Sequence, residues 1–177
     1  MNHLLTALFL LISLSAFAKP NLESVSYVDI ERYAGKWYEI SRYANRFQRK
    51  CAGTTAEYTN KGSYIAVKNS CQQKSDIMKV KVADGYARVA DTKTNSKLRV
   101  SFVPFFGRYG WFAGKYWIIE LGKNYEYAVV GEPKRNFLWI LSRTKAMPTA
   151  LYNEILQRLE SVHHYDTSKL IKTPTWL

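Results

Sequence analysis

The chain has 177 residues, of which 47% are hydrophobic, so it suits one folded domain and is not an intrinsically disordered protein. Aromatic residues make up 15% of the sequence, and the formal net charge is +12. Because aromatic residues favour strands and lined pockets, the composition favours an all-β binding fold. The positive charge permits nucleic acid, anionic membranes or acidic ligands as partners but does not choose among them.

The first 18 residues predict a cleaved signal peptide. They contain no Asp, Glu, Lys or Arg, and the apolar run from Leu4 to Leu14 is too short to span a bilayer. The segment ends in Ala-Phe-Ala, which fits a signal-peptidase site, so we expect a domain over residues 19–177. A buried N-terminal helix is the alternative. Export would place the chain in an oxidising compartment, where we expect no nucleic-acid partner.

The two cysteines, Cys51 and Cys71, are expected to form a disulfide in that compartment. They flank a predicted turn at Lys61-Gly62, and antiparallel partners share a constant sum of residue numbers. The sum for the two cysteines matches a turn centred at position 61, which would place them directly opposite each other. Two cysteines without clustered histidines offer no metal site, and we expect no cofactor.

Short runs of alternating apolar and polar residues predict eight antiparallel strands. Turn residues such as Gly, Asn, Asp and Pro separate these runs. Strands joined in sequence by short turns predict an up-and-down barrel, whose interior can hold one small ligand. The runs cover roughly residues 36–44, 53–60, 64–72, 77–90, 97–103, 114–121, 125–131 and 137–143.

The hydrophobic period changes after the last strand. Leu151, Ile155, Leu159 and Val162 follow one another at helical spacing and would form one apolar stripe. Pro148 suits the start of this helix. The sequence therefore predicts an all-β fold, an eight-stranded antiparallel up-and-down barrel, with one C-terminal α-helix packed outside it.

A motif near the start of the barrel has a known counterpart. Residues 33–42 read YAGKWYEISR, which resembles the Gly-x-Trp motif that opens the lipocalin barrel. The resemblance is strongest to the bacterial lipocalins and apolipoprotein D, and it covers essentially the whole chain after residue 18. Further matching segments are Ala56–Tyr58 in the second strand, Tyr125–Val130 in a central strand, Phe137–Thr144 in the last strand, and Tyr165–Leu170 in the tail.

The resemblance implies structural roles for three residues of the motif regions. Gly35 would let the chain turn tightly into the first strand. Trp37 would plug the closed end of the barrel. Arg143 would lie over the Trp37 ring in a cation–π contact of about 0.5–2 kcal/mol.

One feature departs from the bacterial lipocalins, which are often anchored by a lipid on a cysteine just after the signal peptide. Here Lys19 follows the predicted cleavage site, and the first cysteine is Cys51. We therefore expect an exported protein without that anchor, soluble in the periplasm or secreted.

The resemblance and the alternation of side chains along strands predict a ligand pocket inside the barrel. A solid apolar core is the alternative. The loops after strands one, three, five and seven would surround the mouth, where basic residues would meet an anionic head group or merely form a solvated surface. We expect the interior contacts from Tyr43, Ala56, Tyr58, Val100, Phe102, Trp139 and Leu141, and the contacts at the mouth from Arg46, Arg49, Arg108 and Arg135.

The resemblance implies a small hydrophobic or amphiphilic ligand, an anionic lipid such as a fatty acid or lysophospholipid, that is bound for transport or storage in the cell envelope. No nucleophile–base pair is evident, so we expect no enzyme and no catalytic residues. Three alternatives stay open: a lipocalin-fold enzyme acting on lipids, a basic protein that binds an anionic membrane surface, and a barrel that binds nucleic acid. The oligomeric state stays open as well.

Overall fold

A computed structural model describes residues 19–103 and 113–174. The predicted signal peptide and Arg108 lie outside the described residues. The helices are α1 (Ile30–Tyr33) and α2 (Thr149–Ser161), with the 3-10 turns η1 (Arg46–Gln48) and η3 (Thr167–Lys169). The strands are β1 (Gly35–Tyr43), β2 (Cys51–Asn60), β3 (Ile65–Gln73), β4 (Asp76–Val89), β5 (Lys97–Ser101), β6 (Gly114–Leu121), β7 (Tyr127–Gly131), β8 (Leu138–Ser142) and β9 (Leu170–Lys172).

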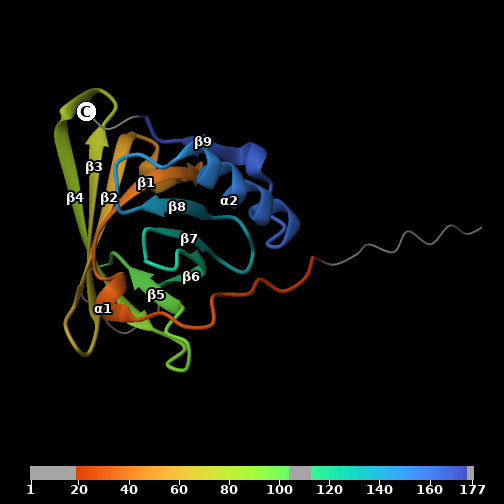
Figure 1. The fold of residues 1–177 in the computed structure, drawn as a ribbon. Coiled ribbons are helices and arrows are strands. Elements are labelled where there is room, and N and C mark those ends of the chain that lie inside the picture. Colours follow the sequence, from red (N-terminus) through yellow and green to blue (C-terminus); the bar gives the residue numbers. More distant parts are fainter. Residues whose placement is uncertain (1–18, 104–112, 175–177) are drawn as a thin grey trace, which may run out of the picture.

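Strands β1 to β8 form a closed antiparallel barrel, which confirms the predicted fold. Each strand pairs with the next along the chain, and β1 pairs with both β2 and β8 to close the barrel. The short strand β9, which the sequence did not predict, pairs with the last residues of β1. Figure 1 shows helix α1 and the β2–β3 turn at one end of the barrel and the β3–β4 turn at the other.

Helix α2 packs on the outside of the barrel, as predicted. Tyr152, Ile155 and Leu159 are buried against outward-facing residues of β7 and β8, including Val129. Val162 is exposed, because the helix ends at Ser161. Its expected place in the apolar stripe is therefore wrong.

The closed end is built around Trp37, which is fully buried. The guanidinium carbon of Arg143 lies 3.8 Å from the centre of the Trp37 ring, as predicted. That guanidinium also donates hydrogen bonds to the backbone carbonyls of Arg32, Lys36 and Tyr125. One side chain thus joins helix α1, the start of β1 and the β6–β7 turn across the base of the barrel.

Gly35 occupies a position where a side chain would be costly. Its φ is +88°, a left-handed conformation that favours glycine, and an added Cβ would lie 3.4 Å from Arg143 Nη1. The glycine therefore permits both the turn into β1 and the approach of the arginine to the Trp37 ring.

The disulfide between Cys51 and Cys71 is confirmed, with the two Cα atoms 5.3 Å apart. The expected register is wrong, because the partner of Cys51 is Gln73 and the partner of Cys71 is Thr54. A β-bulge between Cys51 and Gly53 shifts the pairing at this end of β2. The disulfide therefore joins the strands diagonally and not between directly opposed residues.

Replacement of Trp37 by Ala should destabilise the fold by about 3–5 kcal/mol, because it leaves a cavity at the closed end and removes the ring beneath Arg143. Urea denaturation of the purified variant measures this change. Tyr27→Ala is the matched control, because that side chain is 58% exposed and should lose little stability. A Trp37→Ala variant as stable as the control would show that Trp37 does not plug the barrel.

Candidate functional site

The interior of the barrel is the candidate ligand site. Its wall is an apolar cluster around Trp37 that includes residues from all eight strands of the barrel. Several of the inward-facing side chains, among them those of Val100 and Trp139, are only partly buried. Of the residues predicted to line the interior, the structure places in this cluster Ala56, Tyr58, Val100, Trp139 and Leu141.

Phe102 also lies on the inner side of the sheet. Strand β4 pairs Tyr86 with Ser101 of β5, which brings Phe102 beside Gly85. A Cβ added to Gly85 would fall 2.7 Å from Phe102 Cδ1, so the glycine leaves the space that the ring occupies. Gly85 shares its face with the fully buried Ala87, which places the Phe102 ring toward the interior.

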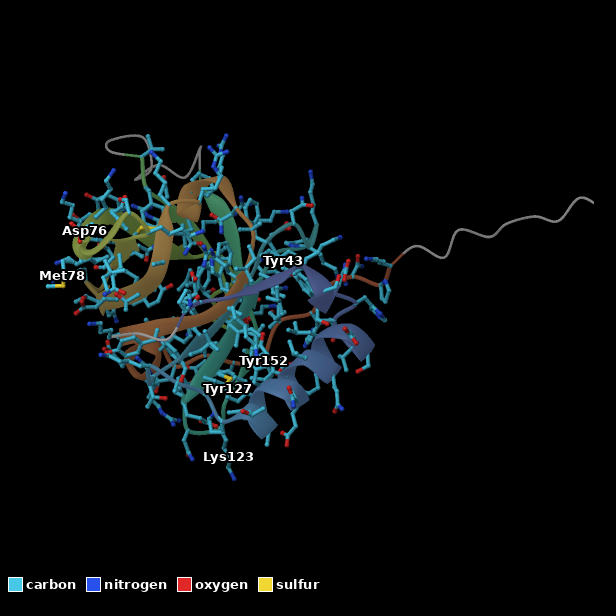
Figure 2. The ribbon with its side chains drawn as sticks, turned by 90° about the horizontal axis from the view of Figure 1, so that it is seen from above. Tyr43, Asp76, Met78, Lys123, Tyr127 and Tyr152 are labelled. Atoms are coloured by element: carbon cyan, nitrogen blue, oxygen red, sulfur yellow. A yellow bond between two sulfur atoms is a disulfide. The ribbon has the colours of Figure 1, made fainter. Side chains whose placement is uncertain are left out.

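Tyr43 does not line the interior, and this expectation is wrong. Strand β1 contains a bulge between Glu39 and Ser41 in its pairing with β8. The extra residue reverses the alternation, so Ser41 and Tyr43 face outward toward α2 and the C-terminal segment. The Tyr43 ring contacts that of Tyr165, and its hydroxyl donates to the Asp166 carbonyl. Figure 2 shows Tyr43 on the side of the molecule that carries α2.

The same bulge turns Arg42 into the barrel beside Glu39, with which it forms a buried ion pair with 2.6 Å between Arg42 Nη1 and Glu39 Oε1. Gln48 of η1 completes a network around this pair. Its amide nitrogen donates to Glu39 and to Thr54 Oγ1, and its amide oxygen accepts from Trp139 Nε1 at 2.9 Å. Gln48 thereby fixes the η1 turn over the end of the barrel opposite Trp37, which is the mouth.

A basic residue that sequence analysis missed lies on the inner face near this network. Thr54 pairs with Cys71, and Cys71 pairs with Lys81 of β4. Because directly opposed residues of antiparallel strands share a face, Lys81 lies on the same face as Thr54. Val80 and Val82 consequently face outward, and this part of β4 is open enough that Lys81 is exposed as well.

Residues 79–82 of β4 read Lys-Val-Lys-Val, and the hydrophobic pattern alone predicts that the valines face the interior. The pairing between neighbouring strands instead indicates which face Lys81 occupies. Tyr58, Val67 and Gly85 are aligned across β2, β3 and β4, and all three are buried. Counting in twos from Gly85 places Lys81 inside.

Of the four arginines expected at the mouth, two lie in the β1–β2 loop as exposed residues, Arg46 and Arg49. The backbone N–H of Lys74 donates to the Lys50 carbonyl, which ties the β3–β4 turn to this loop. Arg108 falls outside the described residues. Two loops of the predicted mouth therefore lie side by side, with exposed basic residues on both.

Arg135 has a structural role that conflicts with the expected one. Its Nε donates to the His163 carbonyl at 2.6 Å, and its Nη2 donates to the Pro20 carbonyl at 2.7 Å. The side chain thereby ties the N-terminal segment to the end of α2. Its guanidinium is directed at these carbonyls and not at the mouth, so the structure does not support a head-group role for Arg135.

Two further properties concern only residues 19–103 and 113–174. Within these ranges, no group of three or more His, Cys, Asp or Glu side chains is arranged to hold a metal ion. No helix in the same ranges has the length and apolar character needed to cross a bilayer.

Comparison with known proteins agrees with this architecture. The model of the lipocalin-like domain family matches residues 28–175. The chain is 38% identical over 160 residues to temperature-induced lipocalin-1 of Arabidopsis thaliana, covering 88% of this chain and 84% of that protein. It is 33% identical over 178 residues to the outer membrane lipoprotein Blc of Escherichia coli K12, covering 94% of this chain and 90% of that protein.

Among solved structures, insecticyanin from the tobacco hornworm Manduca sexta has the same fold, with a TM-score of 0.67 at 20% identity. That match covers 87% of this chain and 84% of insecticyanin. The closed barrel, its capped end and its outer helix therefore define a lipocalin. The chain belongs to the lipocalin-like domain family, whose members bind small hydrophobic ligands.

Proposed function

We propose that this lipocalin binds one fatty acid or lysophospholipid inside its barrel and transports or stores it in the cell envelope. The observation that carries the proposal is an apolar interior, closed at Trp37, with Lys81 on the inner face near the other end. An acyl chain would lie against the apolar wall, and its anionic head would remain near Lys81 and the exposed Arg46 and Arg49. Export to the periplasm or the exterior belongs to the same proposal.

The expected energies indicate that the acyl chain contributes more to the binding affinity than the head group does. Each buried methylene contributes about 0.8 kcal/mol, so a long acyl chain gains on the order of 10 kcal/mol. Association costs of about 4–15 kcal/mol offset much of this gain, which makes micromolar affinity reasonable. An exposed charge contact adds only about 0–1 kcal/mol and is screened by salt. The head group should therefore adjust affinity and orientation while the chain supplies most of the binding.

Binding, and not catalysis, is the function that this interior supports. The buried Glu39 carboxylate already accepts hydrogen bonds from Arg42, Gln48 and Thr173, although Arg42 Nε has no partner among the described residues. Both cysteines are joined in the disulfide and offer no thiolate nucleophile. The polar groups of the interior therefore position the wall and the η1 turn.

A fatty acid should bind more tightly than its methyl ester, by up to about tenfold at low salt, because the ester lacks the charge that Lys81 attracts. Quenching of tryptophan fluorescence measures both affinities. Lys81→Gln should reduce the difference in affinity between the acid and the ester. Lys68→Gln is the matched control, since Lys68 lies on the opposite face of neighbouring β3. Equal affinities for acid and ester at low salt would reject a basic head-group site.

A second candidate function is contact with an anionic membrane, favoured by the exposed residues at the mouth. Phe47 in η1 is 69% exposed, and Met78 near the start of β4 is 86% exposed. The loops next to them are joined by the hydrogen bond from Lys74 N–H to the Lys50 carbonyl. Figure 2 shows Met78 at the margin of the molecule opposite α2. Exposed apolar side chains beside basic ones suit a surface of acidic lipid head groups.

Flotation with vesicles tests this contact. The protein should bind vesicles containing phosphatidylglycerol and not vesicles of phosphatidylcholine alone, and Phe47→Ser with Met78→Ser should weaken the binding several-fold. Val162→Ser is the control, because Val162 is an exposed apolar residue, 62% exposed, that lies at the end of α2. If the control variant loses as much binding as the double variant, the mouth is not the contact surface.

A further inference from the structure

Three tyrosines meet inside the barrel next to the closed end. Tyr33 extends from α1, Tyr58 from β2 and Tyr116 from β6. The Tyr116 hydroxyl oxygen lies 2.7 Å from that of Tyr33 and 2.9 Å from that of Tyr58. The Tyr33 ring also packs against Trp37, with the ring centres 5.1 Å apart. We call these three residues the phenol triad.

The hydrogen bonds within the phenol triad use only two of its three hydroxyl protons. Each hydroxyl has one proton to donate, and two hydrogen bonds join the three oxygens. Whichever way these bonds run, two protons are used and the third has no acceptor in the triad. A buried donor without an acceptor costs free energy, so the triad is a donor site for an oxygen that comes from outside it.

The phenol triad should act as a neutral donor. Burial raises the pKa of Tyr58 to about 12 and raises the pKa values of Tyr33 and Tyr116 above their ordinary value as well. All three groups therefore remain protonated at physiological pH. A carboxylate at this depth would have to lose its hydration among apolar residues, so a neutral acceptor oxygen fits better.

The position of the triad indicates which part of a ligand would reach it. Tyr58 and Thr54 lie on the same face of β2, about 13 Å apart along the strand. Thr54 is aligned through Cys71 with Lys81, the residue assigned to the head group. The phenol triad therefore lies farther from the mouth than the head-group site, where the far end of a chain would arrive.

We propose that the phenol triad binds a neutral oxygen at the far end of an acyl chain, so that the barrel selects chains that are oxygenated at both ends. The ligand class is a long-chain acid with a terminal hydroxyl or keto group. This inference rests on the proposed function, because it requires the chain to enter the barrel with its anionic head at the mouth.

Two positional isomers test the inference in the unmodified protein. Dodecanoic acid with a hydroxyl on its terminal carbon should bind about tenfold more tightly than the isomer with the hydroxyl in mid-chain, because an extended chain of this length covers the distance of about 13 Å to the triad only at its far end. The two ligands have the same atoms and the same head group. Titration by tryptophan fluorescence gives both affinities, with unsubstituted dodecanoic acid as the reference.

Replacing all three tyrosines by phenylalanine tests the assignment to the triad. The triple variant should keep its fold, because it removes the donors and the acceptors together. It should bind the two isomers equally. Tyr127→Phe is the control, because Tyr127 faces outward and contacts Arg158. Circular dichroism and thermal melting verify folding, and the isomer comparison in the unmodified protein does not depend on the variant.

The outcomes separate the two proposals. If dodecanoic acid binds and the isomers bind equally in the unmodified protein, the phenol triad does not recognise the chain end and this inference is overturned. A triple variant that folds and retains the preference overturns it as well. If none of the three acids binds, the proposed function itself fails.

Discussion

The contact between Arg143 and Trp37 is the interaction on which the barrel depends most. The indole fills the base of the barrel, and the guanidinium covers it at 3.8 Å while donating to three backbone carbonyls. These carbonyls belong to segments that are distant in sequence, so one side chain joins both ends of the domain. Gly35 permits the approach, since a side chain there would require an unfavourable φ and would lie close to the arginine. With the base closed, the opposite end becomes the route to the interior.

The bulge in β1 then determines how the interior is divided. Without it, strict alternation would place Ser41 and Tyr43 inside the barrel. The extra residue instead directs Arg42 inward beside Glu39 and leaves Tyr43 to pack against the C-terminal segment. The result is an apolar wall with the hydrogen-bond network of Glu39, Arg42 and Gln48 near the mouth and the phenol triad near the base. A chain-shaped ligand with polar ends suits this distribution better than a wholly apolar ligand.

The fold could be predicted from the sequence because its signals are local and repeated. Alternation, turn residues and the change to helical spacing at Leu151 gave the eight strands and helix α2 their approximate positions. The resemblance added the roles of Trp37 and Arg143, which depend on a pairing across the barrel. The disulfide was also predicted, although a bulge in β2 changed its register.

The site was less predictable, because it depends on which face each residue occupies. A single bulge reversed the assignment of Tyr43, and the pattern of β4 concealed Lys81. Arg135 has the positive charge expected at the mouth, but its guanidinium donates hydrogen bonds to two nearby backbone carbonyls instead. The phenol triad joins α1, β2 and β6, and no local pattern in the sequence brings these elements together.

The central claim is that one ligand occupies the interior, and native mass spectrometry tests it most directly. The protein mixed with hexadecanoic acid should give a complex of one protein with one acid. Ala56→Trp, which fills the interior beside Trp37, should abolish that complex, whereas Ala66→Trp on the outer face of neighbouring β3 should retain it. If both variants fold and both still form the complex, the acid binds outside the barrel, and this result would contradict the account.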